Sequence, residues 1–66
     1  MSAGKYEAER RFAVGQAVIV NDGVRGDEVG VVTKLHPVWE HCYWVIFEDG
    51  FEDLTYESNM KEVGDG

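Results

Sequence analysis

Residues 43–56 read YWVIFEDGFEDLTY, and this stretch decides the fold. Its two flanks are rich in aromatic and β-branched residues, which favour strands. Between them, Asp49-Gly50 supplies turn chemistry, because glycine tolerates the positive φ of short hairpin turns. We predict a β-hairpin with strands at 43–48 and 52–56. Alternation places Tyr43, Val45 and Phe47 on one face of the first strand and Trp44 and Ile46 on the other.

Both faces of this first strand are apolar, so one of them is expected to be covered by a partner strand, a second subunit or a loop. Further strands are predicted at 17–20, 28–36 and 61–63, with a helical turn at 58–60. The apolar residues of 28–36 do not alternate cleanly, which indicates a bulge or strong coiling near Gly30. Pro37 cannot donate to a ladder and ends that strand, and a loop follows to residue 41.

The length of 66 residues allows one domain with a small core. We predict an all-β domain, a single five-stranded SH3-like barrel over residues 12–63, with the helical turn before the last strand. Residues 1–11 form a flexible N-terminal arm and residues 64–66 a C-terminal tail. The single cysteine, Cys42, cannot form an internal disulfide, and no apolar run approaches a membrane span. With no apolar signal core at the N-terminus, we expect a cytoplasmic protein without membrane contact.

The charge is strongly asymmetric. Residues 12–66 carry three basic and eleven acidic side chains, a net charge of −8. Because lysine and arginine contacts to phosphate dominate nucleic-acid affinity, we expect no direct binding of DNA or RNA. The sign suits a basic protein partner or a surface that imitates nucleic acid. The alternative is that the charge only keeps a small protein soluble.

Four short motifs resemble those of SH3-like barrels, in particular Tudor-like and KOW-like domains. Residues 14–20 (VGQAVIV) resemble their opening strand, 28–32 (EVGVV) their second strand, 43–50 (YWVIFEDG) their hairpin, and 58–63 (SNMKEV) their closing turn and strand. Tudor-like domains bind methylated lysine or arginine in an aromatic cage, where ring faces attract a cation. The family normally contributes an aromatic residue from the loop after the first strand, but residues 21–27 contain none.

The candidate binding residues are the aromatic side chains around the hairpin and the carboxylates beside them. Tryptophan is enriched at interface hot spots, and carboxylates can hold a cationic group. The predicted set is Trp39, Trp44, Phe51, Tyr56, Glu48, Asp49, Glu52 and Asp53. A solvated acidic hairpin edge is the simpler interpretation of the carboxylates.

No catalytic residue, metal site or cofactor is predicted. His36, His41 and Cys42 provide zinc-ligand chemistry, but a structural site needs four ligands and no second cluster exists. Adjacent strand residues point to opposite faces, so His41 and Cys42 are not expected to act as a base and nucleophile. The tripeptide Arg25-Gly26-Asp27 is interpreted as a chance occurrence, in which turn geometry explains Gly26 and Asp27.

The leading hypothesis is a non-catalytic acidic interaction module that binds a basic or apolar protein segment through this aromatic patch. One alternative is a homo-oligomeric small-barrel enzyme whose active site lies at the subunit interface, with a pore lined by Tyr56, Thr55 and Lys34. Residues 12–18 are similar to the start of the tetrameric plasmid-type dihydrofolate reductases, but residues 52–56 (EDLTY) lack the glutamine of their catalytic strand. A third hypothesis is an acidic, nucleic-acid-mimicking inhibitor.

Overall fold

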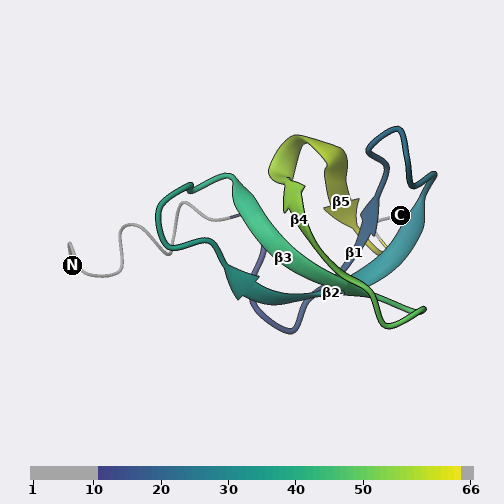
Figure 1. Cartoon of the computed structure of the whole chain (residues 1–66), viewed down its shortest axis with the longest axis horizontal. Helices are drawn as coiled ribbons and strands as arrows, with labels where there is room; N and C mark the ends of the chain where they lie inside the picture. Colours follow the sequence, from purple (N-terminus) through teal and green to yellow (C-terminus); the bar gives the residue numbers. More distant parts are fainter. Residues whose placement is uncertain (1–10, 65–66) are drawn as a thin grey trace.

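The protein folds into one antiparallel sheet of five strands, shown by a computed structural model that describes residues 11–64 (Figure 1). This confirms the predicted all-β class and the helical turn before the last strand. Residues 1–10 of the predicted arm and residues 65 and 66 of the tail lie outside the described residues. The elements are β1 (Ala17–Val20), β2 (Glu28–Leu35), β3 (Cys42–Phe47), β4 (Glu52–Tyr56), the 3₁₀ turn η2 (Glu57–Asn59) and β5 (Met60–Glu62).

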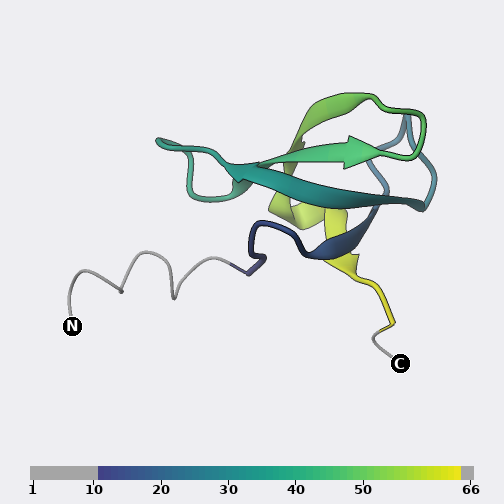
Figure 2. The same cartoon turned by 90° about the horizontal axis from the view of Figure 1, so that it is seen from below.

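The strand order is β4-β3-β2-β1-β5, so β4 and β5 are the two edges of the sheet. The sheet is strongly curved and twisted (Figures 1 and 2). No strand pairing joins β4 to β5 among the described residues, so the predicted barrel is not closed. The physical reason is the connection: the chain leaves β4 through η2 instead of a hairpin turn, and β5 then pairs with β1.

The inner face of the curved sheet holds the core. Tyr43, Val45 and Phe47 of β3 are buried there, as alternation predicts, while Trp44 is half-buried and Ile46 is exposed on the outer face. Phe12, from the segment before β1, packs edge-to-face on Tyr43 with 5.5 Å between ring centroids. The core cluster is Phe12, Val18, Val20, Val32, Tyr43, Val45, Phe47 and Met60, with Leu35 packed against it.

The irregularity of β2 lies at Thr33 and not at Gly30, which corrects the predicted position of a bulge. Register with β3 shifts between Val32 and Lys34, so Thr33 is the extra residue. Gly30 has a different role. A Cβ built at Gly30 lies 2.5 Å from Cγ1 of Val45 and 2.8 Å from the carbonyl oxygen of Ile46. Glycine therefore allows β2 to approach β3 closely over the core.

The β3–β4 connection is the tight hairpin predicted from Asp49-Gly50. The Phe47 amide donates to the Phe51 carbonyl and the Gly50 amide to the Phe47 carbonyl, both at 2.9 Å. Gly50 has φ +87°, the left-handed conformation that glycine adopts without strain. The Asp49 carboxylate accepts the Phe51 amide at 2.9 Å. Among the described residues, no helix has the length and apolar character needed to cross a membrane.

Candidate interaction surface

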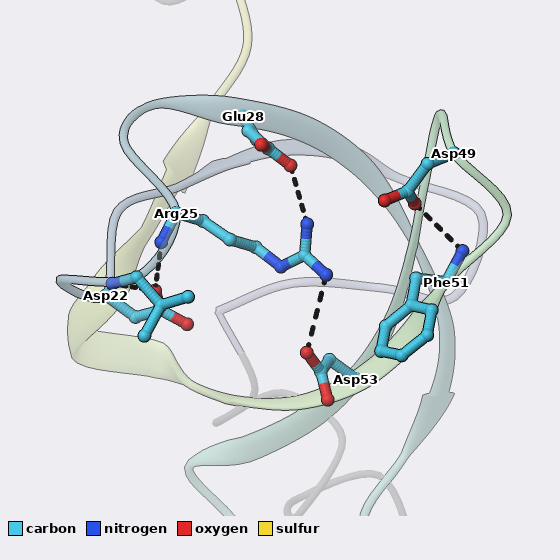
Figure 3. Close-up of polar contacts among 7 residues, drawn as sticks. Asp22, Arg25, Glu28, Asp49, Phe51 and Asp53 are labelled. Carbon is cyan, nitrogen blue, oxygen red and sulfur yellow. Dashed lines mark hydrogen bonds and ion pairs between the residues drawn. The ribbon is translucent and has the colours of Figure 1, made fainter.

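The eight predicted binding residues do not form one patch. Phe51, Asp49 and Asp53 gather near the hairpin turn, around Arg25 of the β1–β2 loop (Figure 3). Trp44 and Glu52 lie on the outer face of the sheet, and Glu48 lies in the turn. Trp39 lies in the β2–β3 loop and Tyr56 opposite Cys42, so both are at the far end of the hairpin.

The outer face carries a continuous strip of apolar side chains, here called the outer patch: Val29, Val31, Trp44, Ile46 and Leu54. Val31 lies directly opposite Ile46, and Trp44 lies directly opposite Leu54. Val29, Val31, Ile46 and Leu54 are each 36–41% exposed, and Trp44 is half-buried. Contiguous exposed apolar surface of this kind marks interaction sites on soluble proteins.

Two polar contacts border the outer patch. The Lys34 ammonium lies 5.5 Å from the centroid of the Trp44 ring, within the range of a cation–π contact. The Thr33 hydroxyl, at the bulge of β2, contacts the Glu52 carboxylate and the Trp44 carbonyl. These contacts place a cation beside the Trp44 ring and a carboxylate at the edge of the outer patch.

An open acidic groove of about 430 Å³ adjoins the outer patch at the end nearest the hairpin turn. It is lined by four carboxylates and one apolar side chain. Val29 belongs to both the groove and the outer patch, so the two surfaces are continuous. The lining residues are Asp27, Glu28, Val29, Glu48 and Asp49.

Arg25 is a residue of the candidate site that sequence reasoning missed. Its guanidinium carbon lies 3.7 Å from the centroid of the Phe47 ring. Its Nη1 and Nη2 lie 2.6 Å and 3.5 Å from the Glu28 and Asp53 carboxylates (Figure 3). Phe51 is more distant, with 6.0 Å to its centroid. The Arg25 side chain is only 12% exposed. We call Phe47, Phe51, Glu28 and Asp53 the guanidinium cradle.

The sequence carried one weak signal for this contact. Arg25 is the only basic residue between positions 12 and 33, in a chain whose other charges in that stretch are acidic. A lone basic side chain in an acidic stretch is expected to pair with a carboxylate. Only the fold shows that one of its partners is Asp53, because folding brings β4 to the β1–β2 loop. Both charged side chains of the Arg25-Gly26-Asp27 tripeptide make contacts within the protein. The Arg25 side chain packs on Phe47, and the Asp27 carboxylate accepts from the Asn21 amide at 3.1 Å.

This arrangement shifts the pKa of two groups, Arg25 and Asp22, from their ordinary values. Burial acts to lower the pKa of Arg25, but the Glu28 and Asp53 carboxylates outweigh it and the pKa is raised. The pKa of Asp22 is lowered, mainly because its carboxylate accepts the Arg25 backbone amide and also accepts the amide of Val24. Both groups are therefore held in their charged forms at neutral pH.

Trp39 and Tyr56 belong to separate local structures. Trp39 stacks on His36 with 4.6 Å between ring centroids, and His36 Nδ1 accepts the backbone amides of Val38 and Trp39. This arrangement shapes the β2–β3 loop. Tyr56 borders a second open groove of about 450 Å³ with Arg11, His41, Glu57 and Ser58.

The residues weighed for metal or catalytic chemistry lie apart. Cys42, the first residue of β3, is buried, whereas His41 precedes the strand and is exposed. In the part of the chain that the structure describes, no group of three or more His, Cys, Asp and Glu side chains is placed to hold a metal ion. Thr55 is buried on the inner face while Tyr56 is exposed on the outer one, so the two cannot line a common pore.

Comparison with known proteins gives no assignment: no protein-family model and no curated protein sequence matches the chain.

Proposed function

We propose that this protein is a non-catalytic, acidic interaction module whose outer patch binds a protein segment that is both apolar and basic. The observation that carries the proposal is the continuity of the outer patch with the acidic groove at Val29. Apolar side chains of the segment would lie on Val31, Ile46 and Leu54. Its lysine or arginine side chains would reach the carboxylates of Glu48 and Asp49.

The apolar and the acidic parts of this surface are expected to contribute differently to binding. Burial of apolar and aromatic surface supplies affinity, with Trp44 as the expected anchor. The carboxylates raise the association rate and select a cationic partner, because opposite charges steer the encounter. The five antiparallel strands and the turn before β5 support the further proposal of an SH3-like, Tudor- or KOW-like relation. The sequence has a single cysteine and so cannot form an internal disulfide, which supports the proposal of a reducing, cytoplasmic compartment.

A second copy of the chain is the less suitable occupant of the outer patch. The net charge is −7, so two copies repel each other when they approach through acidic surfaces. A basic segment instead gains from the same charge. We therefore assign the outer patch to a partner of opposite sign.

The test uses a short synthetic peptide of alternating lysine and valine, with a matched peptide in which glutamate replaces lysine. Backbone amide resonances are followed by NMR during titration. The lysine peptide is expected to shift the resonances of Val29, Val31 and Ile46, and the glutamate peptide is expected to shift none. Trp44→Ala is expected to weaken binding about tenfold or more, since anchor residues contribute more than about 1.4 kcal/mol.

Trp39→Ala is the matched control, because Trp39 is exposed but lies away from the outer patch. It is expected to leave the affinity unchanged. Added salt is expected to weaken binding of the lysine peptide. Equal binding of both peptides, or shifts centred on Trp39, would overturn the proposal. A salt-resistant dimer by light scattering with a protected outer patch would instead assign this surface to self-association.

A further inference from the structure

The guanidinium cradle is built by the sheet, whereas the arginine that fills it comes from a loop. Phe47 belongs to β3 and is buried. Asp53 of β4 lies opposite Val45 of β3, and Glu28 of β2 lies opposite Val20 of β1. Strand pairing therefore fixes the backbone of these three receptor residues without help from Arg25. The Asp49–Phe51 hydrogen bond orders the turn that carries the fourth.

The loop that supplies Arg25 is held mainly by its own short-range contacts. The Asp22 carboxylate accepts the amides of Val24 and Arg25, and the Asp22 amide donates to the Arg25 carbonyl. Gly23, with φ +92°, makes the turn, and Val24 is 93% exposed. Between this turn and the sheet, the Arg25 side chain provides the long-range contact to β4, through Asp53.

The cradle is also accessible from solvent. The carboxylate-bearing side chains of Glu28 and Asp53 remain about half exposed, and Phe51 is 61% exposed. Glu28 also lines the acidic groove, which is open beside the cradle. An incoming cation could therefore meet carboxylates before it reaches the Phe47 ring.

We propose that the cradle is an arginine-binding site occupied in cis, with Arg25 as a built-in competitor that an arginine side chain of a partner displaces. The chemistry selects guanidinium over ammonium. One planar group stacks on Phe47 while two of its nitrogens face two separate carboxylates, and a lysine ammonium cannot reproduce this geometry. This site is distinct from the outer patch and does not depend on peptide binding there.

The test compares the wild type with Arg25→Ala, using N-acetylarginine amide as the probe and N-acetyllysine amide as its comparator. When a competing state hides a site, the apparent affinity falls by the fraction of molecules that are competent. We expect the arginine probe to shift the resonances of Phe47, Phe51 and Asp53 in Arg25→Ala with an affinity at least about tenfold above that of the wild type. The lysine probe is expected to bind more weakly.

Asp53→Asn in the Arg25→Ala background is expected to abolish the saturable shifts. Lys34→Ala, which removes a cation on the outer face, is the matched control and is expected to leave probe binding as in the wild type. A cooperative thermal transition establishes that each variant is folded. If Arg25→Ala does not fold, the wild type gives the readout, because the Arg25 Nε–H resonance is expected to move toward its solvent-exposed position as the arginine probe is added.

The proposal is overturned if folded Arg25→Ala shows no probe-dependent shift at the cradle, or if both probes act equally. It is also overturned if, with Arg25→Ala unfolded, the wild-type Arg25 resonance stays fixed during the titration. A failure here leaves the lysine–valine peptide result on the outer patch unaffected, so the two proposals fail separately.

Discussion

The two faces of β3 are equally apolar in sequence and differ completely in use. Tyr43, Val45 and Phe47 are buried against the core, whereas Trp44 and Ile46 line the outer patch. The comparison teaches that, from Tyr43 to Phe47, the parity of the position decides whether an apolar side chain is buried in the core or lies on the outer face. The inner residues pack in the core, and the outer residues remain at least partly exposed.

The strongest test of this comparison truncates two adjacent residues of β3, one from each face, in separate variants. Phe47→Ala is expected to cost about 3–5 kcal/mol, because it leaves a cavity in the core. For a domain of this size the total stability is only about 3–10 kcal/mol, so much of the variant would be unfolded. Ile46→Ala, one residue away, is expected to cost about 1 kcal/mol. Urea denaturation measures both, and equal costs would contradict the division between the faces.

A second test adds an atom to the inner face. Gly30→Ala places a methyl group 2.5 Å from Val45 Cγ1 and 2.8 Å from the Ile46 carbonyl oxygen. Because part of this obstruction is backbone, β2 must move away from β3, at an expected cost of about 1–3 kcal/mol. Gly26→Ala is the control. A Cβ there meets nothing within 4 Å, so the change is expected to be neutral or slightly stabilising.

The hairpin shows how much of the fold the sequence could predict. Alternation and the Asp49-Gly50 turn correctly predicted β3, β4 and the grouping of Tyr43, Val45 and Phe47 on one face, because these features depend on local chemistry. The position of the bulge was missed, since Gly30 is explained by the approach of Val45, a residue distant in sequence. The open edge between β4 and β5 was also missed, because edge pairing is decided by the path of η2 in three dimensions.

The candidate site was predicted less well than the fold, for the same physical reason. Aromatic and acidic residue types predicted a binding surface, but residue type alone cannot tell which members share a face. Trp44 and Glu52 lie on the outer face, whereas Asp53 points to the inner side and meets Arg25. Arg25 was given no structural role, because its contact with Asp53 spans 28 residues.

A substitution at Thr55 tests the inner face through a smaller change, a gain in stability instead of a loss. Its side chain is buried opposite Tyr43, and its hydroxyl has no hydrogen-bond partner among the described residues. Thr55→Val is expected to stabilise the protein by about 1 kcal/mol, because it removes a buried, unsatisfied polar group at nearly constant volume. Thr33→Val is the matched control at the outer face, where the hydroxyl is bonded to Trp44 and Glu52, and it is expected to destabilise by about 1 kcal/mol. Thermal melts that rank the two variants the other way would contradict this assignment of the faces.

The smallest expected effect concerns the loop that places Arg25 over the inner face, and it depends on pH. The folded-state pKa of Asp22 lies below its ordinary value of 3.8, so the unfolded state binds the proton first as pH falls. The Asp22 contribution to stability is therefore complete well above pH 3.8 and is lost as pH falls through the folded-state pKa. Asp22→Asn keeps an oxygen that can accept the Val24 and Arg25 amides but does not titrate there, so it isolates this contribution. We expect the wild type to be slightly more stable than Asp22→Asn at neutral pH and to lose that advantage in acid, as measured by urea denaturation across the pH range. A difference between the two proteins that is constant with pH would show that the carboxylate charge of Asp22 has no part in holding the loop.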